Sequence, residues 1–148
     1  MSKVAVITGA GTGVGRRVSE VLSKEGIIVY LIGRRKDKLV ETQNMCSGQA
    51  EVLQCDVSDP VAVEKAFQTV EEKHGRLDVL FNNAGIGGWS SLDTLTRDQM
   101  KDTYEVNVFG AAMMPSGASK IFKQQNYGNI INIASTASLK GYKNGTIY

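Results

Sequence analysis

The most informative stretch of the sequence is Val4-Ala5-Val6-Ile7-Thr8-Gly9-Ala10-Gly11-Thr12-Gly13-Val14-Gly15. Its first five residues form a short apolar run rich in β-branched side chains, which is typical of a strand buried on both faces. Glycines then form a turn, and apolar residues at helical spacing follow it as far as Gly26. The stretch therefore predicts a strand, a tight turn and a helix, which together make the first unit of an α/β sheet.

The rest of the chain repeats this alternation of strands and helices. Further apolar runs of strand length predict strands over residues 27–32, 50–54, 77–81 and 129–134. Helices are predicted over residues 34–46, from Ser58-Asp59-Pro60, from the capping box Thr96-Arg97-Asp98-Gln99, and over residues 106–125. Pro115 is expected to kink or interrupt the last of these helices. Regular alternation implies right-handed crossovers, so we predict an α/β fold with a doubly wound parallel sheet of about five strands.

Length and composition limit the classes of protein to which the chain can belong. Its 148 residues suit one domain, and 42% apolar with 22% charged residues is ordinary for a globular protein, which excludes disordered and fibrous classes. The 17 basic and 15 acidic side chains leave a net charge of +2, so no nucleic-acid or membrane partner is expected. Glycine is over-represented, with 16 residues.

The cysteines and the single histidine give no sign of a metal site. Cys46 and Cys55 are nine positions apart without a ligand-spaced histidine, so neither a metal centre nor a disulfide framework is expected. The apolar run at the start of the chain is too short for a signal sequence, and no run is long enough to span a membrane. With two unpaired thiols, this indicates a reducing cytoplasm. His74 precedes Gly75 in the predicted last turn of a helix, where no catalytic role is expected.

The glycine turn has the chemistry of a phosphate site. Backbone N–H groups and the positive end of a helix would face a pyrophosphate there, and Cβ atoms would hold the phosphates away. The turn does not fit the spacing Gly-x-Gly-x-x-Gly or the P-loop pattern, but it fits Thr-Gly-x-x-x-Gly-x-Gly through Gly9, Gly13 and Gly15. The alternative is a tight turn between strand and helix that binds nothing.

Further motifs follow the glycine turn in a fixed order. In chain order they are Asp56-Val57, Asn82-Asn83-Ala84-Gly85, Asn107 in Val106-Asn107-Val108-Phe109-Gly110, Ser135, and Tyr148, which comes thirteen residues after Ser135. Taken singly, each has an ordinary structural explanation, such as a turn-capping asparagine or a serine at a strand end. Taken together with the turn, they resemble the classical short-chain dehydrogenase/reductase family over the whole chain. The resemblance implies a Rossmann fold and hydride transfer between a nicotinamide cofactor and a small carbonyl or alcohol substrate.

The resemblance also implies which residues hold the cofactor. Those in or beside the matching motifs are Gly9, Thr12, Gly13, Val14, Gly15, Asp56, Val57, Asn83, Ala84 and Gly85. Arg34 is also predicted to bind the cofactor, because residues at the end of the second strand contact the 2′ group of the ribose. The position at which an acidic residue would favour NAD(H) is occupied by Gly33, and Arg34 and Arg35 follow directly after it. We therefore expect NADP(H) rather than NAD(H), with Arg34 as the main contact to the 2′-phosphate. The alternative is that these arginines simply begin a solvated helix.

The implied catalytic residues are Asn107, Ser135 and Tyr148. Tyr148 would be the proton donor or acceptor, Ser135 would donate to the substrate oxygen, and Asn107 would hold a water. In the family a lysine four residues after the tyrosine lowers its pKa, but that position would be 152, beyond the 148 residues. An unassisted tyrosine has a pKa of about 10. Lys120 stands in a Gly-Ala-Ser-Lys stretch similar to the end of that motif, but it precedes the fifth predicted strand and is not counted as the missing lysine.

These observations lead to three functional hypotheses. The first is the cofactor-binding portion of a longer oxidoreductase, lacking the C-terminal strands and inactive on its own; the complete enzyme is expected to be a homo-oligomer. The second is a nucleotide-binding or sensor module without turnover. The third is a partner subunit that uses the helix over residues 107–125 as an interface, although Pro115 disturbs the smooth helix that such packing needs.

Overall fold

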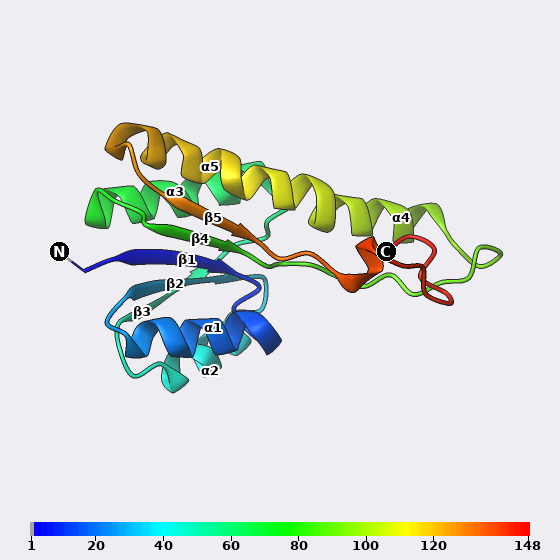
Figure 1. Ribbon diagram of the computed structural model, residues 1–148, viewed down its shortest axis with the longest axis horizontal. Coiled ribbons are helices and arrows are strands. Elements are labelled where there is room, and N and C mark those ends of the chain that lie inside the picture. The colour runs from blue at the N-terminus through cyan, green and yellow to red at the C-terminus, as the bar shows by residue number, and fades with distance from the viewer. Residues whose placement is uncertain (1) are drawn as a thin grey trace.

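The computed structural model describes residues 2–148 and contains one parallel sheet. The strands are β1 (Val4–Thr8), β2 (Ile28–Gly33), β3 (Ala50–Gln54), β4 (Val79–Asn82) and β5 (Asn129–Asn132). All neighbouring pairs run parallel, in the order β3-β2-β1-β4-β5 (Figure 1). The predicted five-stranded, doubly wound α/β fold is confirmed, with strand ends that differ from the predicted ones by one or two residues.

The helices form a layer on each face of the sheet. They are α1 (Gly13–Lys24), α2 (Lys36–Met45), α3 (Pro60–His74), α4 (Arg97–Tyr104) and α5 (Ala111–Gln125). Figure 1 shows α1 and α2 on one side of the strands and α3 and α5 on the other. The α4 helix lies beyond the carboxyl ends of the strands, at the same end as the C-terminus. Residues 2–148 contain no helix that is long and apolar enough to cross a membrane.

The predicted helix ends are confirmed by their caps. Asp59 accepts from the N–H of Val61 and Ala62 and stands before Pro60, the first residue of α3. That helix ends after His74 at Gly75, whose φ of +62° lies in the left-handed region that favours glycine. These local signals act within a few residues, so they could be recognised in the sequence.

Pro115 was expected to kink or interrupt its helix, and the interruption does not occur. The α5 helix continues through Pro115, and the irregular part lies one turn earlier, where Glu105–Gly110 is a π-helix between α4 and α5. Proline has no N–H to donate to the carbonyl of Ala111, four residues before it. The Asn82 side chain supplies the missing donor, with Nδ2 at 2.8 Å from that carbonyl oxygen. A side chain from β4 therefore offsets the cost of the proline.

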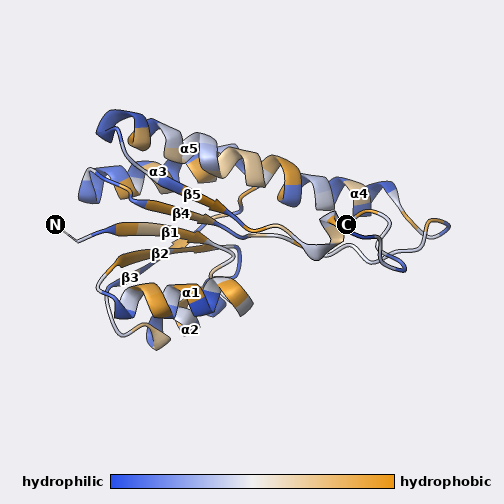
Figure 2. Cartoon of the chain, viewed as in Figure 1, coloured by the Kyte–Doolittle hydropathy of each residue, from blue (hydrophilic) through white to orange (hydrophobic). Residues whose placement is uncertain are grey.

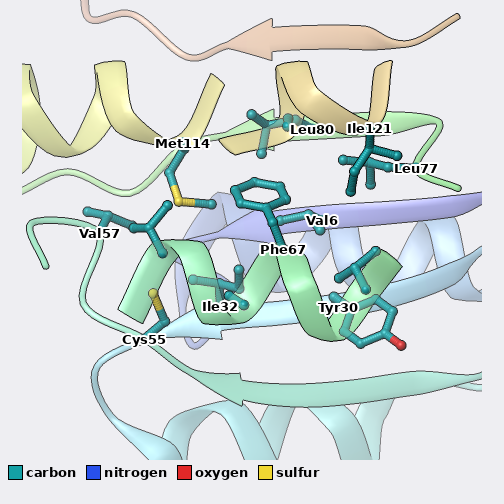
Figure 3. Close-up of a cluster of buried hydrophobic side chains, with 14 of the residues drawn as sticks. Val6, Tyr30, Ile32, Cys55, Val57, Phe67, Leu77, Leu80, Met114 and Ile121 are labelled. Atoms are coloured by element: carbon teal, nitrogen blue, oxygen red, sulfur yellow. The ribbon is translucent and has the colours of Figure 1, made fainter. Parts of the chain in front are cut away.

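Two apolar cores fill the space between the sheet and its helices. Figure 2 shows the central strands as predominantly hydrophobic, as expected for strands covered on both faces. The larger core lies under α3 and α5, where Phe67 packs among Val6, Ile32 and Met114 (Figure 3). The smaller core lies under α1 and α2 and includes Ile7. Apolar burial on both faces fixes the sheet and thereby the position of its carboxyl edge.

The β5 strand forms one edge of the sheet. Its side chains Ile130 and Ile131 are 42% and 45% exposed, as is Ile133 at 45% just after it. The register places Ile130 beside Leu80 and Ile131 beside Phe81 of β4. The strand is therefore paired on one side only among residues 2–148.

Candidate active site

The candidate site lies at the carboxyl edge of the sheet, where the strand order reverses. From β1 the sheet extends through β2 and β3 in one direction and through β4 and β5 in the other. The connections after β1 and β4 leave in opposite directions, which opens a crevice between them. The glycine turn follows β1, and Asn83-Ala84-Gly85 follows β4, so the fold brings these two motifs to one place.

Close packing explains two glycines of the turn. A Cβ atom on Gly15 would lie 2.4 Å from the carbonyl oxygen of Gly9, which no rearrangement of a side chain could relieve. Gly9 has a φ of +65°, and a Cβ there would meet Asn83 Nδ2 at 2.9 Å and the backbone of Ala84. The turn is therefore pressed against the beginning of α1 and the segment after β4. Only residues without a side chain fit at these two points.

Gly13 and Thr12 leave the start of α1 open. Gly13 has a φ of +56°, but a Cβ on it would meet no atom within 4 Å, so this position borders open space. Thr12 precedes the helix and makes no capping hydrogen bond with its side chain, and the first turn contains no acidic residue. The N–H groups at this helix end therefore keep their partial positive charge for an anion.

A buried hydroxyl joins the two motifs. Thr8, at the end of β1, is fully buried, and its Oγ1 accepts from the N–H groups of Asn83 and Ala84, both at 2.8 Å. In return, Asn83 Nδ2 donates to the Thr8 carbonyl at 3.0 Å. These hydrogen bonds fix the height of the Asn83-Ala84-Gly85 segment above the sheet. The sequence predicted the Asn83 motif, but it gave Thr8 no role of its own.

A groove of about 330 Å³ runs along the turn toward the ends of β2 and β3. Ten of the eleven predicted cofactor-binding residues line it: Gly9, Thr12, Gly13, Val14, Arg34, Asp56, Val57, Asn83, Ala84 and Gly85. The eleventh, Gly15, does not line the groove but packs against Gly9 of the turn. Arg35 and Lys38 line it as well. Among residues 2–148, neither Arg34 nor Arg35 is part of an ion pair.

The two residues after β3 differ in their chemistry. Asp56 Oδ1 accepts from both the N–H and the hydroxyl of Ser58, which holds this carboxylate at the wall of the groove. Cys55 also lines the groove, but it is only 3% exposed. Burial, together with the nearby charges of Asp56 and Asp59, raises the pKa of the Cys55 thiol to about 11, so this cysteine is an apolar wall rather than a nucleophile.

The groove suits a ligand that carries a diphosphate and a further phosphate. An open helix end suits a pyrophosphate, and two unpaired guanidinium groups at the far end suit a further phosphate. The glycines keep Cβ atoms out of the space that the phosphates need. A neutral ligand would leave these positive groups without a partner.

A second cavity, of about 920 Å³, adjoins the groove and contains the predicted catalytic residues. Asn107, Ser135 and Tyr148 all line it, and Asn83, Ala84, Gly85 and Ile86 belong to both spaces. The fold therefore brings together residues from the π-helix, from the segment after β5 and from the end of the chain. No Lys, Arg or His of residues 2–148 lines this cavity.

Asn107 holds the backbone of the segment that separates the two spaces. Its Nδ2 donates to the carbonyl of Ile86 at 2.8 Å, and its Oδ1 accepts from the Ile86 N–H at 2.9 Å. Both ends of the amide are engaged with one residue, so the side chain clamps the segment after β4 to the π-helix. The sequence singled out Asn107, but the π-helix that presents it could not be foreseen.

Ser135 and Tyr148 both line this cavity, with Ser135 half-buried and Tyr148 exposed. Ser135 Oγ accepts from the N–H of Ala137 at 3.1 Å, at the start of the short turn η2 (Thr136–Ser138). Tyr148 is 43% exposed, and its ring lies against that of Trp89, with 6.1 Å between the centroids. Trp89 itself does not line the cavity.

A network of charges that the sequence did not predict braces the glycine turn from α2. Arg16 donates to the carbonyl of Gly11 at 2.5 Å, to Thr42 Oγ1 at 3.0 Å and to Glu41 at 3.0 Å. Lys38 donates to the other oxygen of Glu41 at 2.5 Å. Hydrogen bonds from Lys38 and Arg16 hold the pKa of Glu41 below its ordinary value. Glu41 and Thr42 follow Arg16 by 25 and 26 residues, so only the packing of α1 on α2 reveals these two contacts.

Comparisons with known proteins agree with this geometry. The sequence profile of the family described as "short chain dehydrogenase" matches residues 3–148. An uncharacterized oxidoreductase of Staphylococcus aureus (strain N315) is 33% identical over 147 residues, which are 99% of this chain and 64% of that protein. The chain thus spans somewhat less than two thirds of the length of this relative.

Two solved structures have the same fold. A short-chain dehydrogenase/reductase from Burkholderia phymatum in complex with NAD is 31% identical, with a TM-score of 0.95 over 99% of this chain and 54% of that one. An actinorhodin polyketide ketoreductase variant with NADPH is also 31% identical, with a TM-score of 0.94 over 99% of this chain and 58% of that one. The profile, the relatives and the fold agree, and the chain belongs to the short-chain dehydrogenase family of oxidoreductases.

Proposed function

We propose that the protein transfers a hydride between a nicotinamide cofactor, with NADP(H) preferred, and the carbonyl or alcohol carbon of a small molecule. The observation that carries the cofactor preference is the pair of guanidinium groups, Arg34 and Arg35, which line the groove without an acidic partner among residues 2–148. Gly33 supplies no carboxylate for the ribose hydroxyls of NAD(H). A 2′-phosphate would give both arginines a charge-assisted partner.

The bound nicotinamide would supply or accept the hydride, and the chain's own residues would handle the proton and the developing charge. Tyr148 is proposed to give a proton to the substrate oxygen, or take one from it. Ser135 Oγ accepts a bond from Ala137, which leaves its hydroxyl hydrogen to donate to that same oxygen. Asn107 is proposed as the positioning residue that holds Ile86 between the two spaces.

We propose cofactor binding without efficient turnover for the 148-residue chain itself. A nearby cation would favour the phenolate, and no Lys, Arg or His of residues 2–148 lines the cavity that contains Tyr148. This observation favours the second candidate function, a nucleotide-binding module, for this part of the protein.

We also propose that the 148 residues form a single dinucleotide-binding domain of a cytoplasmic protein that assembles as a homo-oligomer. The unbroken sheet supports the first point, and two free thiols, Cys46 and Cys55, support a reducing compartment. Exposed apolar side chains on the π-helix, Val108 at 47% and Phe109 at 53%, support self-association.

Cofactor preference is tested by replacing Arg34 with alanine. We expect Arg34→Ala to weaken NADPH binding about tenfold or more, because a hydrogen bond to a charged group contributes about 1.5–3 kcal/mol, while NADH binding changes less than about twofold. Titration calorimetry with both cofactors measures this. Arg17→Ala is the matched control, because Arg17 is an exposed arginine of α1 that pairs with Glu20. An equal loss for NADPH and NADH would remove Arg34 from the proposed role.

Turnover is tested by following NADPH absorbance with a panel of ketones and aldehydes. We expect the 148-residue chain to bind NADPH but to consume it no faster than its Tyr148→Phe variant, since an unassisted phenol is a poor proton carrier at neutral pH. Rapid reduction by the unaltered chain that the Phe variant loses would contradict the proposed lack of turnover. The same result would support the role of Tyr148.

A further inference from the structure

One carboxylate beside the groove holds two cations at once. Glu41 Oε1 accepts from Lys38 Nζ at 2.5 Å, and its Oε2 accepts from Arg16 Nη2 at 3.0 Å. The side chains of Glu41 and Lys38 are 44% and 35% exposed, so dissolved anions can reach the pair. Lys38 also lines the groove, together with Arg34 and Arg35. The basic end of the groove therefore contains one cation that already has an anionic partner from the chain.

We propose that Glu41 sets the strength of the preference for a phosphorylated ribose, by pairing with Lys38 when the groove is empty and competing for it when a 2′-phosphate binds. The inference rests on the proposed NADP(H) function. The first carbons of Lys38 are held in place, because a Cβ on Gly11 would lie 3.0 Å from Lys38 Cβ. The remaining carbons and the ammonium group are free to turn from the carboxylate to a phosphate. Exchange of one anion for the other would make Lys38 a third cation for the 2′-phosphate.

Arg16 cannot make the same exchange. Besides Glu41 it binds the carbonyl of Gly11 and the hydroxyl of Thr42, and Thr42 is fully buried and donates in turn to the Ala10 carbonyl at 2.9 Å. These bonds remain when the charge of Glu41 is removed. Neutralising Glu41 therefore releases Lys38 while the glycine turn keeps its brace.

The test is Glu41→Gln, measured by titration calorimetry with NADPH, NADH, 2′-AMP and 5′-AMP. Because an exposed ion pair stabilises only weakly, we expect NADPH and 2′-AMP to bind about two- to fivefold more tightly. NADH and 5′-AMP lack the 2′-phosphate and are expected to change less than about 1.5-fold. Glu64→Gln is the matched control. Glu64 lies on α3, across the sheet, in an exposed pair with Lys120 of α5, and removing its charge is expected to change the affinity for neither cofactor.

Lys38→Gln separates the proposed exchange from a general effect of charge. Alone, it is expected to weaken NADPH binding, and in the Lys38→Gln/Glu41→Gln double variant the gain from neutralising Glu41 is expected to vanish. A gain that persists without Lys38, or that Glu64→Gln reproduces, overturns the inference. The inference is also overturned if the unaltered chain prefers NADPH and the Glu41→Gln substitution leaves its affinity for NADPH unchanged. If the unaltered chain binds neither NADPH nor 2′-AMP, the proposed function fails as well, which is a distinguishable result.

Discussion

Replacing Gly15 with alanine is expected to destabilise the fold and abolish cofactor binding together. The added Cβ would lie 2.4 Å from the Gly9 carbonyl oxygen and 2.8 Å from its carbon. Both are backbone atoms, so the turn between β1 and α1 must move as a whole. Forcing extra atoms into a packed site typically costs 1–3 kcal/mol, and a collision with backbone belongs at the upper end, about 3 kcal/mol. For a chain of this size that corresponds to a fall in Tm of roughly 10 °C.

The displaced turn would also lose its hydrogen-bonding geometry toward the ligand. Gly15 faces Gly9, and Gly9 in turn touches Asn83, so a shift passes from the glycine turn to the segment after β4. We expect no measurable NADPH binding by Gly15→Ala at concentrations that saturate the unaltered chain. Thermal unfolding, followed by circular dichroism, measures the stability. The fluorescence of Trp89, the only tryptophan, measures NADPH binding on the same sample.

Gly13→Ala provides the matched control within the same turn. Its Cβ would meet no atom within 4 Å, so the main cost is the φ of +56°, about 1–2 kcal/mol for a residue with a side chain. We expect this variant to fold with a much smaller loss of Tm, while its new methyl group weakens NADPH binding by occupying space in the groove. Equal stability losses for the two variants would show that the close contact at Gly15 is not what requires glycine there.

The parts of the fold that the sequence predicted correctly depend on short-range physics. Buried strands appear as continuous apolar runs, and caps such as Asp59 and Gly75 act on backbone groups a few residues away. The strand predicted over residues 77–81 is confirmed as β4, but it starts two residues later and ends one residue later than predicted. Leu77 and Asp78 are buried but precede β4, and Asp78 accepts from the N–H of Val4 at 2.8 Å. The N–H of Asp78 also donates to the Val4 carbonyl at 2.8 Å, and the Asp78 carbonyl accepts from the N–H of Asn129 at 3.0 Å. Burial and backbone hydrogen bonding therefore begin just before β4, which is why the sequence predicts an earlier start for this strand.

The parts that could not be predicted depend on contacts between distant residues. The penalty of Pro115 was foreseeable, but its relief by Asn82, which precedes Pro115 by more than thirty residues, was not. The bracing of the glycine turn by Arg16, Glu41 and Lys38 likewise exists only because α1 packs beside α2. Motif spacing in the sequence identified the residues around the groove. The ion pairs of Arg16, Glu41 and Lys38 beside it could be recognised only once the packing of α1 against α2 was known.

Replacing Thr8 with valine is the second change with a large expected effect. Valine has nearly the same shape but no hydroxyl, so the N–H groups of Asn83 and Ala84 would lose the acceptor they share at 2.8 Å. Thr8 is fully buried, so water cannot easily replace the lost oxygen. A buried polar group without a partner costs about 1–3 kcal/mol, so we expect the free energy of unfolding to fall by about 2–5 kcal/mol. Urea unfolding measures it.

Thr8→Ser separates the hydroxyl from the methyl group. Serine keeps the acceptor and loses one methyl, which costs about 1 kcal/mol when a small buried group is removed. Because Asn83 and Ala84 line both the groove and the adjoining cavity, the valine variant is also expected to bind NADPH more weakly than the serine variant does. If valine and serine at this position gave equal stability and equal affinity, the two N–H groups would not depend on Thr8. The segment after β4 would then be held by Asn83 and its bond to the Thr8 carbonyl, which neither substitution removes.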